Sequence, residues 1–338
     1  MPIQNSEIAF VSCHFNPCNY ALPVENLAKT KESLAKFGIG FHVATCEFCS
    51  YEDLKEGKTG DDFISASIIW QKEALLNAAV ARLPGAIKYI VIIDADVLID
   101  DDKWLEKLKE SLNNHSIVQP WKRGIFLNAD GEEQGLMASC GYGNSLDDPR
   151  ASNFRVYHPG LIWAFRRNFW TIGPGLFDLC PVGTGDVLLA NALISSTPNE
   201  IDATNQMLSE KMRQWENDLS IWLQGERIGY VDADVKTLYH GEFKNRKYAS
   251  RVELAKDFDP STDIKPRTEP GVIEWTDYAR ENKATMIEGI AGYFNARLED
   301  GDTWKKVTPK EIYINPPDQP NLYDVESLDE IASIPYEL

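Results

Sequence analysis

The chain has 338 residues, and its 52 acidic residues against 34 Lys and Arg give a formal net charge of −18. Hydrophobic residues make up 43% and charged residues 25%, as in ordinary globular proteins, which excludes a disordered, collagen-like or coiled-coil chain. The acidic balance argues against a protein that coats nucleic acid, because phosphate binding needs a basic face. No signal-peptide pattern and no run of roughly 18 apolar residues is present, so we expect a cytoplasmic protein without a membrane span.

The first elements alternate between strand and helix. Residues 8–11 are apolar and predict a short strand that ends in a loop over residues 12–20. Apolar residues on one stripe predict a helix over residues 24–37, and residues 41–44 predict a second strand. Because a helical crossover joins the two strands, we expect them to be parallel.

The next elements lead to the most apolar strand of the chain. Helical spacing of apolar residues predicts a helix over residues 67–83. Residues 89–93 are almost purely apolar and rich in β-branched side chains, which is typical of a central strand buried on both faces. A helix over residues 103–112 and a strand at 117–118 are expected to follow.

The second half of the chain has weaker patterns. Residues 123–155 are rich in Gly and Asp, which predicts a long loop of the kind that often borders a binding site. We expect a strand at residues 160–165, a helix at 185–194 and a strand at 228–231.

The C-terminal part is expected to be mainly helical, around residues 275–294. Residues 311–338 contain seven acidic residues and no Lys or Arg, but they keep several apolar side chains. That tail is either a disordered acidic end or an ordered wrap, and its apolar residues favour the wrap.

Six cysteines are present: Cys13, Cys18, Cys46, Cys49, Cys140 and Cys180. The spacing of Cys46 and Cys49, together with Cys13 and Cys18, is compatible with a zinc site. The alternative is a set of reduced, half-buried thiols. No second Cys pair with this spacing exists, so the pattern favours reduced thiols.

Two carboxylates stand at the end of the most apolar strand, at Asp94 and Asp96. Ligands of open α/β sheets sit at the carboxyl ends of strands. Carboxylates suit hard cations such as Mg²⁺ or Mn²⁺, and such an ion can bridge a diphosphate leaving group. The alternative is a strand-end turn with a helix-capping Asp.

The same tetrapeptide recurs at residues 232–235, after a shorter and less apolar strand, and is the weaker metal candidate. His240 follows it, and then several cations that include Lys244 and Arg246. Cations beside a metal site are what a diphosphate leaving group requires, although a solvated basic turn would have the same composition.

These motifs resemble, in order and spacing, those of nucleotide-sugar-dependent glycosyltransferases of the GT-A fold. The resemblance is greatest to family-2-like enzymes of phages, large viruses and bacteria, and it covers roughly residues 8–251. The motifs that carry it are, in chain order, Trp-Gln-Lys-Glu at 70–73 with Asn77, the Asp-Ala-Asp at 94–96, Val-Gln-Pro at 118–120, His-Pro-Gly at 158–160 with Trp163 and Ala164, Gly-Thr-Gly-Asp at 183–186, Tyr-His-Gly at 239–241, and Asn-Arg-Lys-Tyr at 245–248.

The resemblance implies a fold and a domain division. It implies an α/β, Rossmann-type sandwich with a mainly parallel central sheet flanked by helices, plus a helical C-terminal extension. The catalytic domain would cover residues 1–250, with a nucleotide-sugar half over about 1–120 and an acceptor half over about 121–250. Residues 251–338 would form the extension and the acidic tail.

The resemblance also implies roles for individual residues. Asp94, Asp96 and His240 would hold Mn²⁺ or Mg²⁺, and Asp186 would be the catalytic base, unless it is only a helix cap. The residues expected to bind the nucleotide sugar are Ser12, Phe15, Asn16, Lys72, Asn77, Asp94, Ala95, Lys244 and Arg246. Those expected to border the acceptor are His158, Gly160, Trp163 and Gly185. Tryptophans such as Trp121, Trp163 and Trp170 could stack on a sugar face, but a core role is expected for most of them.

One departure from the resemblance concerns the helix that begins near residue 185. The inverting pattern often has Glu-Asp or Asp-Asp before this helix, whereas here it is Gly185 and Asp186. This departure bears on the base and on the stereochemistry. The expected function is a metal-dependent hexosyl- or pentosyltransferase that inverts the anomeric centre, and the alternative, if Asp186 is not positioned as a base, is a retaining reaction.

The implied donor is a UDP- or GDP-linked sugar, and the acceptor is a glycan, a protein or a modified nucleobase. The expected setting is a bacterial or virus-infected host cell. Two other functions stay open: a nucleotidyltransferase, for which the loop at 12–16 lacks the Gly-rich phosphate pattern, and a non-catalytic carbohydrate- or protein-binding module.

Overall fold

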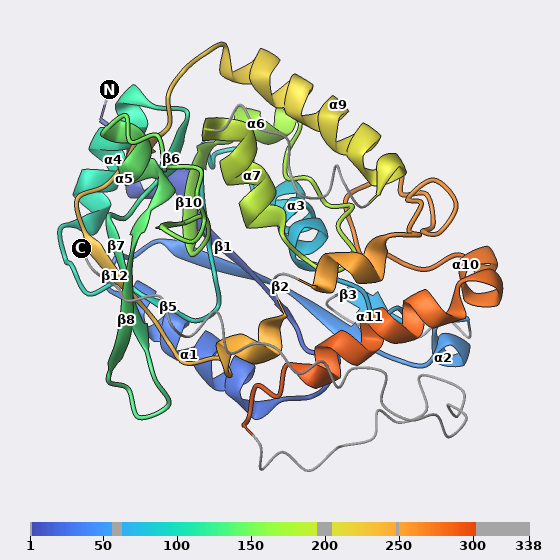
Figure 1. Ribbon diagram of the computed structural model, residues 1–338. Coiled ribbons are helices and arrows are strands. Elements are labelled where there is room, and N and C mark those ends of the chain that lie inside the picture. Colours follow the sequence, from blue (N-terminus) through green and yellow to red (C-terminus); the bar gives the residue numbers. More distant parts are fainter. Residues whose placement is uncertain (1, 56–62, 195–204, 248–249, 302–338) are drawn as a thin grey trace.

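The computed structural model describes residues 2–55, 63–194, 205–247 and 250–301 (Figure 1). The strands are β1 (Ile8–Phe15), β2 (Gly40–Phe48), β3 (Phe63–Ser65), β4 (Tyr89–Ile93), β5 (Val97–Leu98), β6 (Ile117–Gln119), β7 (Arg123–Leu127), β8 (Glu133–Ser139), β9 (Tyr157–His158), β10 (Ile162–Arg166), β11 (Gly229–Tyr230) and β12 (Asp234–Thr237). The helices are α1 (Ala21–Ala35), α2 (Tyr51–Lys55), α3 (Lys72–Arg82), α4 (Trp104–Asn114), α5 (Cys140–Ser145), α6 (Asn168–Thr171), α7 (Gly185–Ile194), α9 (Gln206–Leu223), α10 (Asp277–Asn282) and α11 (Ala284–Ala296).

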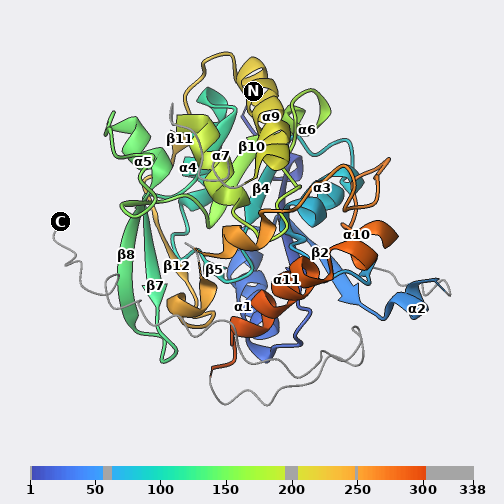
Figure 2. The same ribbon diagram turned by 45° about the vertical axis from the view of Figure 1, so that its right-hand side comes forward.

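A seven-stranded sheet in the order β11-β6-β10-β4-β1-β2-β3 forms the centre of the described chain. All of its neighbouring pairs are parallel except those of β10, which runs antiparallel to β4 and β6. Helices lie on both sides of this sheet (Figure 2). The predicted fold class, an α/β sandwich with a mainly parallel central sheet flanked by helices, is confirmed.

Successive residues of the central strands belong to opposite faces of the sheet. Ile90 and Ile92 of β4 pack into one core cluster, and Val91 and Ile93 pack into the other. Strand β1 alternates in the same way. Because both faces are covered, the apolar run at 89–93 is buried, as its composition predicted.

A second sheet, in the order β5-β12-β7-β8-β9, stands beside the first and appears on the left in both views (Figures 1 and 2). Strands β7 and β8 form an antiparallel hairpin within residues 123–155, so the prediction of a long loop there was wrong. Asn128 starts the turn, since its side-chain oxygen accepts the backbone N–H groups of Asp130 and Glu132.

Helix α3 begins five residues later than the sequence predicted. Residues before Lys72 instead follow the chain near residue 273: Gln71 donates to the carbonyl of Ile273 and accepts its N–H, each at 2.8 Å. These tertiary hydrogen bonds replace the first helical turn. Helix α9 was not predicted, whereas α7 begins and ends where expected.

The C-terminal helices α10 and α11 pack on the same core as α3. Trp275, Ile290 and Phe294 are buried in that cluster. The expected helix around 275–294 is present as two helices that meet at Lys283. The acidic tail at 311–338 lies outside the described residues. Among the described helices, none has the length and apolar character needed to cross a membrane.

Candidate active site

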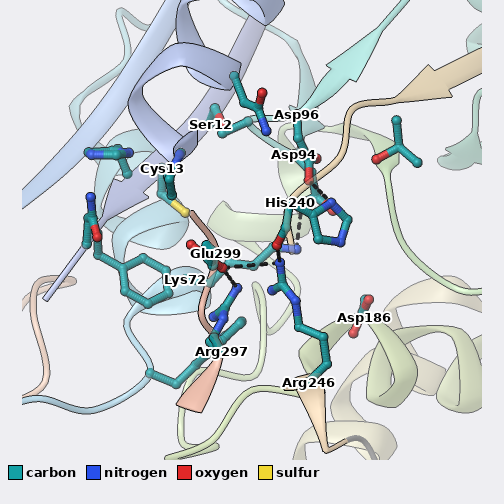
Figure 3. A pocket seen from close by; sticks show the side chains of 18 of the residues that line it. Ser12, Cys13, Lys72, Asp94, Asp96, Asp186, His240, Arg246, Arg297 and Glu299 are labelled. Atoms are coloured by element: carbon teal, nitrogen blue, oxygen red, sulfur yellow. Dashed lines mark hydrogen bonds and ion pairs between the residues drawn. The ribbon is translucent and has the colours of Figure 1, made fainter. Parts of the chain in front are cut away.

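A polar pocket opens where β1 and β4 end (Figure 3). Eleven of the residues expected to have a functional role line it: Ser12, Phe15, Asn16, Lys72, Asp94, Ala95, Asp96, His158, Asp186, His240 and Arg246. They come from segments up to 234 residues apart in the sequence. The parallel strands therefore bring the predicted donor and acceptor residues to one place.

Asp94 follows the last residue of β4 and pairs with Lys72 at the start of α3. Its Oδ1 atom lies 2.6 Å from Lys72 Nζ. Burial raises the pKa of Asp94, and the Lys72 ammonium opposes that rise. Burial acts to lower the pKa of Lys72, but the surrounding carboxylates, led by Asp94, outweigh burial and raise it, so Lys72 is charged.

Asp96 pairs with His240 instead. Asp96 Oδ2 and His240 Nδ1 are 2.7 Å apart, and Figure 3 shows the two side chains side by side. Burial acts to raise the pKa of Asp96, but His240, followed by Arg246, outweighs burial and holds it below its ordinary value. In the described part of the chain, no group of three or more His, Cys, Asp and Glu side chains is arranged to hold a metal ion unaided.

The segment just before the end of the described chain closes this side of the pocket. Glu299 is buried and contacts Arg246 at 3.1 Å and Arg297 at 2.5 Å. Burial raises the pKa of Glu299, and Arg246 opposes that rise. Asp300 accepts the N–H groups of Ala21 and Leu22 at 2.8 Å, which caps α1.

Sequence reasoning missed this segment. No local sequence pattern marks this segment, because Glu299 and Arg297 reach the site only through the packing of α11. Gly241 is the one indirect sign: it has a φ of +96°, and an added Cβ would lie 3.2 Å from the backbone of both Arg297 and Glu299. Only glycine allows that close approach in this conformation.

Asp186 lies on the first turn of α7 and lines the same pocket, close enough to Lys72 for the two charges to interact. Its Oδ1 atom accepts the N–H of Val187 at 2.9 Å. Burial acts to raise its pKa, but Lys72, followed by His158, lowers the pKa of Asp186 overall, so the carboxylate is ionised. An added Cβ on Gly160 would lie 2.7 Å from Asp186 Oδ2, so a side chain at position 160 would clash with this carboxylate.

His158 is held as a neutral ring. Its Nδ1 atom accepts the N–H of Gly160 at 3.1 Å, which leaves the ring proton on Nε2. Burial lowers the pKa of His158 to about 4. The buried Gln119 donates to the carbonyls of His158 and Gly160, at 3.1 and 3.2 Å, and fixes this turn.

Glu73 is a pocket residue to which the sequence analysis gave no role. It is buried on α3, and its Oε2 atom accepts the indole N–H of Trp70 at 3.0 Å. Burial raises the pKa of Glu73 to about 7. A carboxylic acid among the alanines and leucines of α3 is the signal that could have identified it.

Five of the expected site residues do not line the pocket: Asn77, Gly160, Trp163, Gly185 and Lys244. Asn77 donates to the carbonyl of Leu176 and accepts from Trp170 Nε1, so it joins α3 to the segment that follows α6. Trp163 is buried and donates to the carbonyl of Pro159.

Asn16, Trp121 and the six cysteines have features of structural residues. Asn16 lines the pocket, but its side-chain amide both donates to and accepts from the backbone of Tyr20. Trp121 is fully buried, in keeping with a core role. All six cysteines are free thiols, and burial raises the pKa of Cys13 and Cys46.

The second Asp-Ala-Asp-Val copy lies outside the pocket. Asp232 pairs with Lys122 at 3.1 Å, and Asp234 accepts two hydrogen bonds from Arg123. These contacts lie at the surface of the second sheet, where Asp234 begins β12 beside β7. This copy has the surroundings of a solvated strand end.

Comparisons with known proteins give distant matches. Neither a known family model nor a curated protein matches the chain. Among solved structures, glucosyl-3-phosphoglycerate synthase from Mycobacterium tuberculosis, in complex with Mn²⁺, UDP and phosphoglyceric acid, is 12% identical over 77% of this chain and 81% of that one, with a TM-score of 0.36.

Two further matches are similarly distant. The catalytic domain of Drosophila β1,4-galactosyltransferase 7, in complex with xylobiose, is 13% identical over 54% of this chain and has a TM-score of 0.29; the match spans 58% of that domain. A glycosyltransferase involved in the glycosylation of the major capsid of PBCV-1 is 9% identical over 84% of this chain and 98% of that one, with a TM-score of 0.28. The matching structures thus include glycosyltransferases, the class that the sequence motifs resemble.

Proposed function

We propose that this protein is a metal-dependent glycosyltransferase that moves a sugar from a nucleoside diphosphate sugar to an acceptor hydroxyl group. One observation carries the proposal: a single pocket is lined by Asp94 and Asp96, each with its cation, and by the ionised Asp186. The first two aspartates with their cations suit a diphosphate, and Asp186 suits a hydroxyl that must lose a proton.

The chemistry of the donor residues fits Mg²⁺ or Mn²⁺. These ions are commonly bound through one or two carboxylates, with substrate phosphates and water completing the shell, so a closed protein cage is not required. Asp96, His240 and Asp94 would hold the ion. When bound, the ion would supply charge that stabilises the departing diphosphate.

The cations around the site support the same assignment. Arg246 is almost fully buried, and its Nη2 atom donates to the backbone carbonyl of His240. Its Nε atom is buried without a hydrogen-bond partner among the described residues. Arg246 therefore places a fixed positive charge beside Asp96 and His240, where a diphosphate gains negative charge as the anomeric bond breaks.

Asp186 is proposed as the catalytic base. It would take the proton of the acceptor hydroxyl as the oxygen attacks the anomeric carbon, and a single in-line attack would invert that centre. The neighbouring cations keep its carboxylate ionised, which is the form a base needs. His158 lines the pocket beside Asp186, and Gly160 and Gly185 would shape the acceptor end by leaving space for Asp186 and Glu73. Trp163 is buried and would act only through its hydrogen bond to the carbonyl of Pro159.

The nucleoside is assigned to the end of β1. Ser12 and Phe15 line the pocket there, and the Phe15 ring packs edge-on against Trp70 with the ring centres 5.3 Å apart. Lys72 holds Asp94 through its ion pair, so its proposed role is to orient that carboxylate. UDP or GDP is the proposed nucleotide, and a glycan, a protein or a modified nucleobase the proposed acceptor.

In this proposal residues 1–120 form most of the nucleotide-sugar half, and residues 121–250 most of the acceptor half. The division is not strict in space, because Arg246 lies at the donor end together with Glu299. The C-terminal extension would then complete the donor site as well as pack on the core.

The direct test is turnover. The purified chain would be incubated with UDP- and GDP-linked sugars and Mn²⁺, and release of the nucleoside diphosphate would be measured with and without simple sugar acceptors. We expect slow hydrolysis of one donor in wild type and loss of at least about a hundredfold in Asp186→Asn, because general bases contribute that much. Absence of turnover with every donor would contradict the proposal and favour a binding module.

A further inference from the structure

The turn that carries Asp186 rests on two side chains of the 70–73 segment. Gly183 has a φ of +93°, and an added Cβ there would lie 3.0 Å from the Trp70 ring. At Gly185 an added Cβ would lie only 2.2 Å from Glu73 Oε1 and 2.4 Å from Glu73 Cδ. The carboxyl group of Glu73 therefore fills the space that a side chain at position 185 would occupy.

Glu73 has structural contacts, because its Oε2 atom accepts the Trp70 indole N–H and the acid stands in the first turn of α3, where the helix dipole favours a negative charge. Glu73 is 6% exposed, and the other buried residues of α3 are mainly Ala and Leu. Burying a carboxyl group carries a desolvation penalty that an apolar residue avoids. The adjacent Lys72 opposes the effect of burial on the pKa of Glu73 without a direct contact, and its ion pair is with Asp94.

The position of Glu73 relates it to the pocket and to Asp186. Glu73 lines the same pocket as Asp186, the Asp186 carboxylate acts to raise the pKa of Glu73, and Lys72 acts to lower the pKa of both carboxyl groups. Oε2 is engaged by Trp70, and Oε1 is the oxygen nearest Gly185, the residue that precedes Asp186. The two carboxyl groups thus flank one turn at the acceptor end.

We propose that Glu73 supplies a second carboxyl group to the acceptor end, from α3 and in place of a side chain at position 185, and that it hydrogen-bonds an acceptor hydroxyl next to the reacting one. This inference rests on the proposed function. It implies an acceptor with at least two neighbouring hydroxyl groups, that is, a carbohydrate or another polyol rather than an isolated hydroxyl.

The role of Glu73 is binding, and the proton balance of the reaction does not involve it. The acceptor oxygen forms the new bond to the anomeric carbon, and its proton goes to Asp186. The bond between that carbon and the diphosphate oxygen breaks, and its electron pair leaves with the nucleoside diphosphate. Since burial raises the pKa of Glu73 to about 7, both of its forms occur near neutral pH, and either can hydrogen-bond a hydroxyl group.

The test moves the carboxyl group from one element to the other. Glu73→Ala removes it, and the double variant Glu73→Ala with Gly185→Asp returns a carboxyl group from the α7 side. The matched control is Glu73→Ala with Gly185→Ala, which refills the space without an acid. Both double variants lack the same partner for Trp70, so any loss of folding is shared and their difference reports on the carboxyl group.

The measured quantities are kcat and KM for a sugar acceptor, together with the Kd of the nucleoside diphosphate. We expect Glu73→Ala to lower kcat/KM for the acceptor about tenfold to a hundredfold, as for a lost hydrogen bond to a charged group, with the donor Kd unchanged. The Gly185→Asp double variant should recover about tenfold over its Ala control. Equal activity of the two double variants would overturn the inference.

Glu73→Gln keeps an acceptor for the Trp70 N–H and so guards against a folding defect. We expect it to lose roughly fivefold to tenfold in acceptor kcat/KM, because an amide holds a hydroxyl less strongly than a carboxylate does. An unchanged value would overturn the role of Glu73. If wild type itself has no turnover, the proposed function fails instead, so the two failures are distinguishable.

Discussion

The tetrapeptide Asp-Ala-Asp-Val occurs twice in this chain, at residues 94–97 and 232–235, and its two copies lie in different surroundings. In the first, the Asp94 side chain is 26% exposed and its partner lysine lines the pocket. In the second, the Asp232 side chain is 71% exposed and its partner lies at the surface. Identical residues therefore acquire different chemistry from the strands around them.

The reason lies in the element that precedes each copy. Strand β4 is a five-residue apolar strand between β1 and β10, so its end opens at the centre of the sheet. Strand β11 has two residues and lies at the sheet edge. A short motif of carboxylates indicates a metal site only when a buried strand delivers it to a cleft.

The largest expected difference between the copies is in turnover. Asp96→Asn should lower donor turnover by about a thousandfold, because it removes a carboxylate proposed to hold the ion that stabilises the departing diphosphate. Asp234→Asn should stay within about twofold of wild type, since its partner Arg123 is solvent-exposed. Steady-state assays with the best donor check both. Equal losses in the two variants would break the distinction.

The second difference is in stability. Lys72→Met leaves Asp94 without its ion pair in a largely buried site and should lower the free energy of unfolding by about 3 kcal/mol. Lys122→Met removes the partner of the exposed Asp232 and should change it by less than about 1 kcal/mol. Urea unfolding of both variants is the measurement, and a larger loss for Lys122→Met would be inconsistent with this account.

The pocket should also respond to acid, through His158. Its pKa of about 4 lies below the ordinary value of 6.5, so between these values the unfolded chain binds a proton that the folded chain does not. Stability should therefore fall as pH drops from 7 to 5, by roughly 2 kcal/mol from this group. His158→Asn should flatten that slope in urea unfolding, whereas Lys122→Met should keep the wild-type slope.

Glu73 should act in the opposite direction with an effect of similar size. Its raised pKa of about 7 means that the folded chain keeps a proton that the unfolded chain releases above about pH 4.5. This group therefore lowers stability as pH rises from 5 to 7, by roughly 2 kcal/mol. Glu73→Gln should gain stability relative to wild type over that range. A constant difference between the two proteins at all pH values would show that Glu73 titrates normally.

The first copy and its strand were predictable because burial on both faces leaves a continuous apolar run at residues 89–93. Helix α7 was predictable from its own apolar residues. The hairpin of β7 and β8 was missed because Gly and Asp residues obscured the alternation of its strands. The start of α3 was predicted too early because Gln71 forms tertiary hydrogen bonds in place of the helical turn that the spacing before residue 72 indicates.

Residues of the candidate site were predictable only where they stand directly beside a strand or helix that the sequence pattern indicates. Asp94, Asp96 and Asp186 follow or begin regular elements, so position along the chain was informative. Glu299 and Glu73 were missed, because one reaches the pocket through packing of a distant helix and the other through a gap left by Gly185. Such complementarity between segments has no local pattern.

The most direct test of the central claim is titration calorimetry with UDP and GDP, each with and without Mn²⁺. It would use wild type, Asp96→Asn and Asp234→Asn. We predict that one nucleoside diphosphate binds wild type and Asp234→Asn in the presence of the metal, and that Asp96→Asn binds it at least about a hundredfold more weakly. Equal affinity in Asp96→Asn and wild type, or no binding to any of the three proteins, would contradict the assignment of the first copy as the donor site.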